Sequence, residues 1–322
     1  MPDQPTSDHH LTRRDIHRTQ HTQDPEMAHK TNAAHVAEHY NMRRELGVEG
    51  RMHTQITGLR LFNNWLKSIL FRMFVPRNCR VLDLGCGKGG DLRKWCIAGI
   101  GEYVGMDIAH VSVAQAQKRY SELRNPKFTA RFFAQDCYAE PLEKTLQPPD
   151  YQADVISAQF CLHYAFETER KARQMMHNIS SHLAHNGVFM CTIPNANWLV
   201  KKARASGGRA FGNSVYRVEF VKDPEDIQRF GTAYAFTLDE AVEDCTEYLV
   251  HMPTLIELAA EHGLELELCR EFHELFAEHS QLRPSVELIH RMNVLTPERP
   301  QMSADEWEAV GIYLAVAFRK TN

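Results

Sequence analysis

Hydrophobic residues follow two alternating patterns along most of the chain. Short apolar runs, typical of buried parallel strands, recur between longer segments in which apolar residues mark one face of a helix. The strand-like segments are residues 80–84, 102–107, 128–135, 153–159, 187–193, 264–268 and 311–318, and the helix-like segments are 34–74, 109–123, 170–184 and 253–262. Because strands that alternate with helices form parallel sheets, the sequence predicts an α/β fold with a doubly wound, seven-stranded sheet.

The alternation breaks between about residues 195 and 252. Val215–Phe220 has the alternating pattern of an antiparallel strand, and Tyr234–Phe236 is a second short candidate. A basic segment, residues 201–209, comes before both. We therefore expect an insertion that carries its own antiparallel strands.

Residues 1–34 differ from the rest in composition. They are poor in large apolar residues, and seven of the 18 histidines fall within the first 39 residues. The histidine spacing is irregular and no cysteine accompanies it, which favours a disordered polar tail over a metal-binding tract. The predicted organisation is a tail over 1–34 and one folded domain over 35–322.

Composition narrows the class of protein. A net charge of −4 is not typical of a general nucleic-acid binder, so any such surface would be a local patch. No apolar stretch reaches the roughly 18 residues that span a membrane. The eight cysteines never form a C-x-x-C pair, which favours buried thiols in a reducing compartment over metal ligation or disulfides.

A glycine-rich turn follows the first strand. Gly85, Gly87, Gly89 and Gly90 come directly after it, and Asp91 stands where a helix N-cap belongs. Such glycines let a ligand approach the backbone, and an acid that ends the next strand, about 20 residues on, can bind a ribose. Two kinds of cofactor, S-adenosylmethionine (SAM) and dinucleotides, use such a turn, and a merely structural turn is the third alternative.

Two acids separate these alternatives. Asp107 occupies the ribose position, and Asp83 lies two residues before the first glycine. A carboxylate at Asp83 would repel a pyrophosphate, whereas it suits a ligand that carries an ammonium group and a sulfonium. The residues therefore favour SAM.

Other polar residues are expected near the same edge. Asn63 and Lys67 are four residues apart on the first long helix and share a face, which is either solvated or directed at a ligand. Asp136, Phe160 and Pro194 follow later strands. Because the carboxyl ends of parallel strands meet at one edge, we expect these loops to lie close together.

Several discontinuous motifs, taken in order, resemble the cellular mRNA cap guanine-N7 methyltransferases over about residues 39–319. The glycine motif alone is common to many methyltransferases, whereas Phe62-Asn-Asn-Trp-Leu-Lys67 and Phe211-Gly-Asn-Ser-Val-Tyr216 are far more discriminating. The other matching segments are 82–91, 103–107, 159–164, 194–195 and 247–250.

The resemblance implies a set of binding residues. SAM would be held by Asn63, Lys67, Asp83, Gly85, Asp91, Asp107, Asp136 and Gln159. The cap guanine would be held by Phe160, His163, Tyr164, Pro194, Tyr234, Phe236, Glu247 and Tyr313. Glu247 suits guanine because one carboxylate can accept its N1–H and N2–H₂ donors together. Guanine N7 has no proton to lose, so we assign no general base and no metal ligand.

The resemblance also implies a cellular setting and leaves other functions to be separated. The substrate would be 5′-capped mRNA (GpppN), the location the nucleus and the enzyme a monomer, with RNA polymerase II or other capping components as candidate partners. The basic segment 201–209 would either attract the cap triphosphate or be only a solvated loop. The alternative functions are a small-molecule SAM-dependent methyltransferase and a non-catalytic RNA-binding relative, which would have no need of the Asp83 and Asp107 pair.

Overall fold

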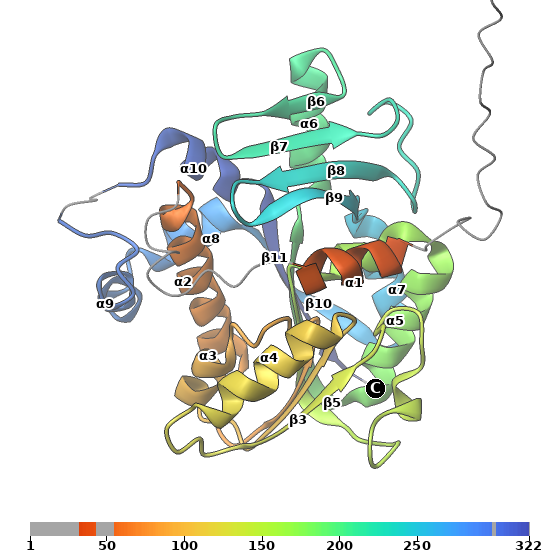
Figure 1. The fold of residues 1–322 in the computed structure, drawn as a ribbon, viewed down its shortest axis with the longest axis vertical. Helices are drawn as coiled ribbons and strands as arrows, with labels where there is room; N and C mark the ends of the chain where they lie inside the picture. Colours follow the sequence, from red (N-terminus) through yellow and green to blue (C-terminus); the bar gives the residue numbers. More distant parts are fainter. Residues whose placement is uncertain (1–31, 43–54, 298–300, 322) are drawn as a thin grey trace, which may run out of the picture.

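The computed structural model describes residues 32–42, 55–297 and 301–321. A seven-stranded sheet forms its centre, in the order β10-β11-β5-β4-β1-β2-β3 (Figure 1). The strands are β1 Arg80–Leu84, β2 Glu102–Asp107, β3 Thr129–Ala134, β4 Ala153–Gln159, β5 Leu183–Pro194, β10 Leu264–Glu271 and β11 Tyr313–Lys320. Only β11 runs antiparallel to its neighbours, β5 and β10. The predicted α/β sheet of seven strands is confirmed, and each expected segment overlaps one of them.

Helices cover both faces of this sheet. One face packs against α2 Thr57–Phe74, α3 Leu92–Ala98 and α8 Phe272–His279. The other packs against α5 Glu169–His182 and α7 Met252–Ala260. The amphipathic pattern explains α2, because its apolar stripe, which includes Phe62, Leu66 and Ile69, is buried. Further helices are α4 His110–Ser121, α9 Arg283–Arg291 and α10 Ala304–Val310, and there are 3₁₀ turns at Leu142–Lys144 and Leu162–Glu167.

The prediction of one helical segment over 34–74 is wrong, because two separate helices occupy the described part of this region. Helix α1 spans Asn32–Met42, and α2 begins only at Thr57. The expected tail boundary at residue 34 therefore falls inside α1. Residues 1–31 lie outside the described residues, so the predicted disordered tail stays a prediction.

The inserted strands form a second sheet beyond one end of the first (Figure 1). It is antiparallel, in the order β6-β7-β8-β9, and its strands are β6 Ala210–Gly212, β7 Tyr216–Phe220, β8 Ala233–Leu238 and β9 Val242–Tyr248. The insertion is confirmed, and β6 and β9 were not anticipated. Both strands are too short or too polar to have a clear alternating pattern.

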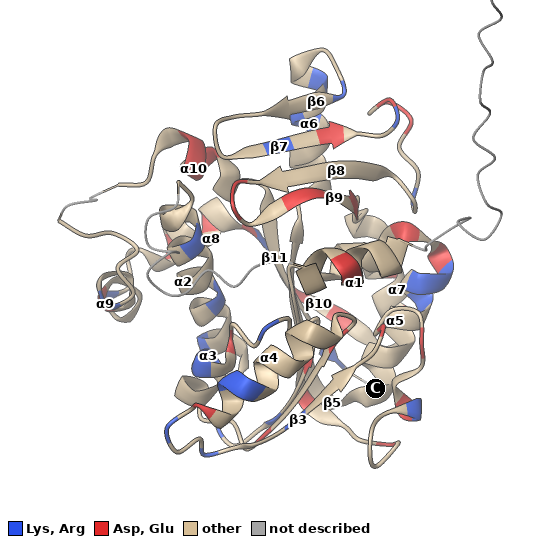
Figure 2. Ribbon diagram, in the orientation of Figure 1, with Lys and Arg blue, Asp and Glu red and all other residues tan. Residues whose placement is uncertain are grey.

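The basic segment 201–209 lies on helix α6, Ala196–Ser206, and the turn after it. Two of its four basic side chains form ion pairs. Lys202 Nζ is 3.1 Å from Glu308 Oε1, and Arg204 Nε is 2.7 Å from Glu225 Oε1. Basic and acidic residues are likewise interspersed over the rest of the visible ribbon (Figure 2). This pairing weakens the case for the segment as an RNA-attracting patch. Within the described residues, no helix has the length and apolar character needed to cross a membrane.

Candidate functional site

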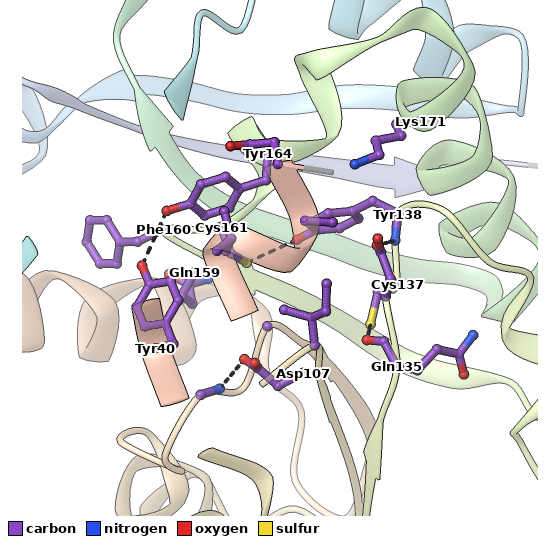
Figure 3. Close-up of a pocket in the computed structure, with 17 residues that line it drawn as sticks. Tyr40, Asp107, Gln135, Cys137, Tyr138, Gln159, Phe160, Cys161, Tyr164 and Lys171 are labelled. Atoms are coloured by element: carbon purple, nitrogen blue, oxygen red, sulfur yellow. Dashed lines mark hydrogen bonds between the residues drawn. The ribbon is translucent and has the colours of Figure 1, made fainter. Parts of the chain in front are cut away.

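A pocket opens at the carboxyl ends of β1, β2 and β4, with helix α1 as one wall (Figure 3). Six residues that the sequence predicts for binding line it, namely Gly85, Asp107, Asp136, Gln159, Phe160 and Tyr164. The pocket therefore contains predicted cofactor residues and two predicted guanine residues side by side.

The glycine turn shapes the floor of the pocket. Gly85 and Gly87 adopt φ values of 71° and 51°, which favour glycine. A Cβ at Gly85 would lie 2.5 Å from Cys161 Sγ, so a side chain there would also collide with the neighbouring loop. The turn thus has no side chains at Gly85 and Gly87, where a ligand would approach the backbone.

Asp107 joins this turn to the end of β2. Its Oδ2 accepts a hydrogen bond from the Gly87 amide at 2.8 Å, and its Oδ1 accepts one from the Ala109 amide at 2.8 Å (Figure 3). Burial raises the pKa of Asp107, and these two amides oppose that effect. The carboxylate is held rigidly, and each oxygen keeps a second lone pair for a ribose hydroxyl.

Two further predicted residues have polar atoms that are free for a ligand. The Gln159 amide nitrogen donates to Ser157 Oγ at 3.3 Å, whereas its Oε1 is buried and has no hydrogen-bond partner among the described residues. Asp136 accepts the amides of Tyr138 and Ala139, at 2.9 and 3.1 Å, and both bonds end on Oδ1. An unpartnered buried oxygen is costly, so a ligand donor at Gln159 would satisfy it.

Asp83, Asn63, Lys67 and Asp91 do not line the pocket. Asp83 is buried beneath it and accepts a hydrogen bond from the Tyr103 hydroxyl at 2.9 Å. Burial, and then the charge of Asp91, raise the pKa of Asp83 to about 7. The Asn63 Oδ1 atom is buried and also lacks a partner among the described residues.

Asp91 stands at the N-cap position of α3, but its side chain makes no capping hydrogen bond. Its carboxylate instead bridges two lysines. Lys67 Nζ lies 2.7 Å from Oδ2, and Lys94 Nζ lies 2.6 Å from Oδ1. Asp91 therefore stabilises the contact of α2 with the glycine turn rather than the end of α3.

The predicted guanine residues meet around Glu247, which is buried on β9. The Tyr234 hydroxyl donates to Glu247 Oε2 at 2.8 Å. His163 Nε2 lies 3.4 Å from Glu247 Oε1, but the geometry is not that of a hydrogen bond, and both His163 nitrogens lack partners among the described residues. Burial, and then Glu247, raise the pKa of Tyr234, so its hydroxyl stays protonated as a donor.

Aromatic rings connect this carboxylate to the pocket. Phe160 has a φ of 60°, and its ring lies edge-on to Tyr313 with centroids 4.9 Å apart. Pro194 is the strand partner of Tyr313, and Phe236 is buried on β8. Of the predicted guanine residues, Phe160 and Tyr164 line the pocket, Tyr313 and His163 pack against these two rings, and contacts of any of them with a base stay predictions.

Sequence reasoning missed the wall formed by α1, of which Asn32, Ala33, Val36 and Tyr40 line the pocket. The Tyr40 hydroxyl lies 3.3 Å from that of Tyr164, and Asn41 Oδ1 accepts the Val111 amide at 3.1 Å. The sequence predicts a helix in this region but no pocket residue on it. Nothing in its pattern indicates which distant residues it would contact.

These features together fit SAM. The acid at Asp107 suits a ribose, the glycine turn lets a ligand approach the protein backbone, and the buried unpartnered Oε1 of Gln159 can accept a donor. Among the described residues, no cluster of three or more His, Cys, Asp or Glu side chains could hold a metal ion.

Comparisons with known proteins identify the family of this chain. A family model described as the mRNA (guanine-N(7))-methyltransferase domain matches residues 23–321. The mRNA cap guanine-N(7) methyltransferase of Schizosaccharomyces pombe is 42% identical, over 88% of this chain and 81% of that protein. The enzyme of the same name from Cryptococcus neoformans (strain B-3501A) is 44% identical over 88% of this chain, which spans only 41% of its length.

Solved structures support the fold alone. The CcbJ methyltransferase of Streptomyces caelestis matches with a TM-score of 0.51 at 15% identity, over 80% of this chain and 90% of that chain. The α/β methyltransferase architecture expected from the sequence is therefore confirmed at the level of topology.

Proposed function

Because the chain belongs to the mRNA (guanine-N(7))-methyltransferase family, we propose that it transfers the methyl group of SAM to N7 of the 5′-terminal guanine of capped mRNA. One observation carries the proposal furthest. A buried carboxylate, Glu247, accepts a hydrogen bond from Tyr234 and lies 3.4 Å from His163, whose ring packs against Tyr164 in the pocket that also contains Asp107 and the glycine turn. A plain SAM-binding sheet has no use for such a carboxylate, whereas guanine offers it two adjacent donors.

The proposed roles of the guanine residues follow from their chemistry. The Glu247 carboxylate accepts N1–H and N2–H₂, while the Tyr234 hydroxyl occupies one lone pair of Oε2 and keeps the carboxylate in place. Phe160 and Tyr313 supply flat apolar surfaces for the base. His163 and Tyr164, whose ring centroids are 4.3 Å apart, close the same end of the site.

The cofactor residues have a different task. Asp107 holds the ribose of SAM, and Gln159 and Asp136 contact the rest of its nucleoside. Lys67 and Asp83 lie toward the amino-acid end of SAM. When bound, SAM supplies a methyl group already activated by its sulfonium. Guanine N7 carries a free lone pair, so the protein removes no proton from it. Catalysis then depends on holding N7 in line with the methyl carbon at near-attack distance.

The cellular part of the proposal depends on the family's place in mRNA capping. We expect a nuclear enzyme that acts as a monomer, with RNA polymerase II or other capping components as partners. The chain spans less than half the length of its two Cryptococcus relatives, so their remaining regions contribute nothing to this inference.

Methyl transfer from labelled SAM to GpppA and GpppG tests the function, with ATP and GTP as controls. We expect label in the dinucleotide caps, at N7 of the guanine, and at most a trace in the free nucleotides. Equal labelling of GTP would show that the cap is not required and would favour a small-molecule methyltransferase. Binding of SAM with no transfer to any cap would favour the non-catalytic relative.

A further inference from the structure

A buried group of three charged side chains connects α2 to the glycine turn. The Asp91 carboxylate uses one oxygen for Lys67 and the other for Lys94, at 2.7 and 2.6 Å. All three side chains are nearly buried, at 12–13% exposure. Basic residues of α2 and α3 gather where the two helices meet (Figure 2). Such a group is held together by charge-assisted hydrogen bonds in a water-poor environment.

Lys94 has partners on two elements. Besides Asp91, its Nζ donates to Asn64 Oδ1 at 2.7 Å, and Asn64 Nδ2 donates to the Arg60 carbonyl at 3.0 Å. Lys94 therefore connects the first turn of α3 to the middle of α2. It does not line the pocket, so any effect on a ligand must pass through another residue.

Lys67 is the residue through which that effect would pass. Its Nζ lies 5.7 Å from the ring centroid of Phe160, which does line the pocket. An ammonium has three N–H donors, and Asp91 takes one of them. The remaining donors are available for an anionic group at that end of the pocket.

The charges within the group are unequal. Two lysines face one carboxylate, Asp91, whose pKa is below its usual range because both lysines outweigh the effect of burial. The next acid, Asp83, is buried and has a raised pKa of about 7, so it compensates only in part near neutral pH. A buried excess of positive charge favours an added carboxylate, and the amino-acid end of SAM carries one.

We propose that Lys94 is a positioning residue for the amino-acid end of the cofactor. Lys94 occupies Asp91 Oδ1, so only Asp91 Oδ2 is left for Lys67. The Lys67 ammonium therefore stays directed toward the ligand. Without Lys94, both Asp91 oxygens would be free to chelate Lys67 and draw it away. The inference rests on the proposed function only in taking SAM as the ligand.

Two ligands distinguish this positioning role from a general contribution of Lys94 to the stability of the fold. S-adenosylhomocysteine has the amino-acid end, whereas 5′-methylthioadenosine has the same nucleoside and thioether without it. For Lys94→Met we expect titration calorimetry to show about 10-fold weaker binding of S-adenosylhomocysteine. Binding of 5′-methylthioadenosine should stay within about 2-fold. Arg93→Met, at an exposed neighbour on α3, is the matched control and should change neither affinity.

The remaining outcomes contradict the proposal. Equal weakening of both ligands would make Lys94 a structural support, and unchanged binding of both would mean that Asp91 and Lys67 do not need it. Should Lys94→Met fail to fold, Lys94→Leu also removes the donor to Asp91 and is read by the same ratio of affinities. No cap is present in these titrations. A protein that binds S-adenosylhomocysteine but methylates no cap would therefore fail the proposed function and leave this inference intact.

Discussion

Replacing Glu247 by glutamine should weaken the recognition of guanine and leave the cofactor site unchanged. The substitution keeps the size of a side chain that is buried at 5% exposure, so packing changes little. It removes the charge and one of the two acceptor oxygens. Tyr234 already donates to Oε2, so in the variant its hydroxyl and the guanine donors compete for the single remaining oxygen.

The magnitude follows from this count of donors and acceptors. The wild-type carboxylate can accept the Tyr234 hydroxyl together with guanine N1–H and N2–H₂. The variant loses at least one hydrogen bond to a charged group, about 1.5–3 kcal/mol, and it places an amide N–H against a guanine donor. A loss of about 1.4 kcal/mol already corresponds to 10-fold. We therefore expect kcat/KM for GpppA to fall by at least about 10-fold.

The assay measures kcat/KM for GpppA together with SAM affinity by calorimetry. Glu243→Gln is the control, since Glu243 lies on the same strand with its side chain exposed, and it should behave as wild type. Normal cap methylation by Glu247→Gln would refute the proposal that this carboxylate recognises guanine. Equal loss of SAM affinity would refute it too, because the damage would then not be confined to the guanine end.

Three further predictions concern other parts of the protein. Asp107→Ala should cost about 1–3 kcal/mol of SAM affinity by calorimetry, and unchanged affinity would remove Asp107 from the ribose contact. Asp83 has a folded pKa of about 7, above its unfolded value, so its contribution to stability is present below about pH 4 and is lost as the pH rises to 7. Asp83→Asn should remove that dependence, on the order of 4 kcal/mol in urea unfolding at pH 4 against pH 7, and an identical pH profile would contradict the assignment. A chain that begins at residue 32 should keep its kcat. A chain that begins at residue 43 lacks the α1 wall of the pocket and should have a raised KM for SAM. Equal KM values for the two chains would show that this wall is dispensable.

The sheet and the glycine turn were predictable from the sequence because their signals are local. An apolar run such as Ala153–Gln159 is buried on both faces of a parallel sheet, and its observed bounds match the expected ones. The glycines before Asp91 mark a turn whatever the surroundings. Asp107 follows from the same logic, since the end of β2 must lie beside the end of β1.

Contacts that join distant segments could not be predicted in this way. Asp91 has the sequence context of an N-cap, yet Lys67 and Lys94 take its carboxylate, because a buried ion pair outweighs a capping bond in that environment. The approach of Tyr40 to Tyr164 depends on where α1 packs, which no periodicity encodes. The guanine residues came from resemblance to a family, and spacing alone would not have assembled them.

The left-handed backbone of Phe160 limits how this protein can be engineered. A residue other than glycine or asparagine at a φ of 60° stores on the order of 1–3 kcal/mol of strain. The Phe160 amide is held there by the carbonyl and the hydroxyl of Thr192, at 3.1 and 2.9 Å. A search for thermostable variants would tend to relax this position, and glycine would relieve the strain only by deleting the ring that lies between Lys67 and Tyr313. Stability and turnover therefore oppose each other at this residue. Substitutions meant to raise the melting temperature are better placed at other positions.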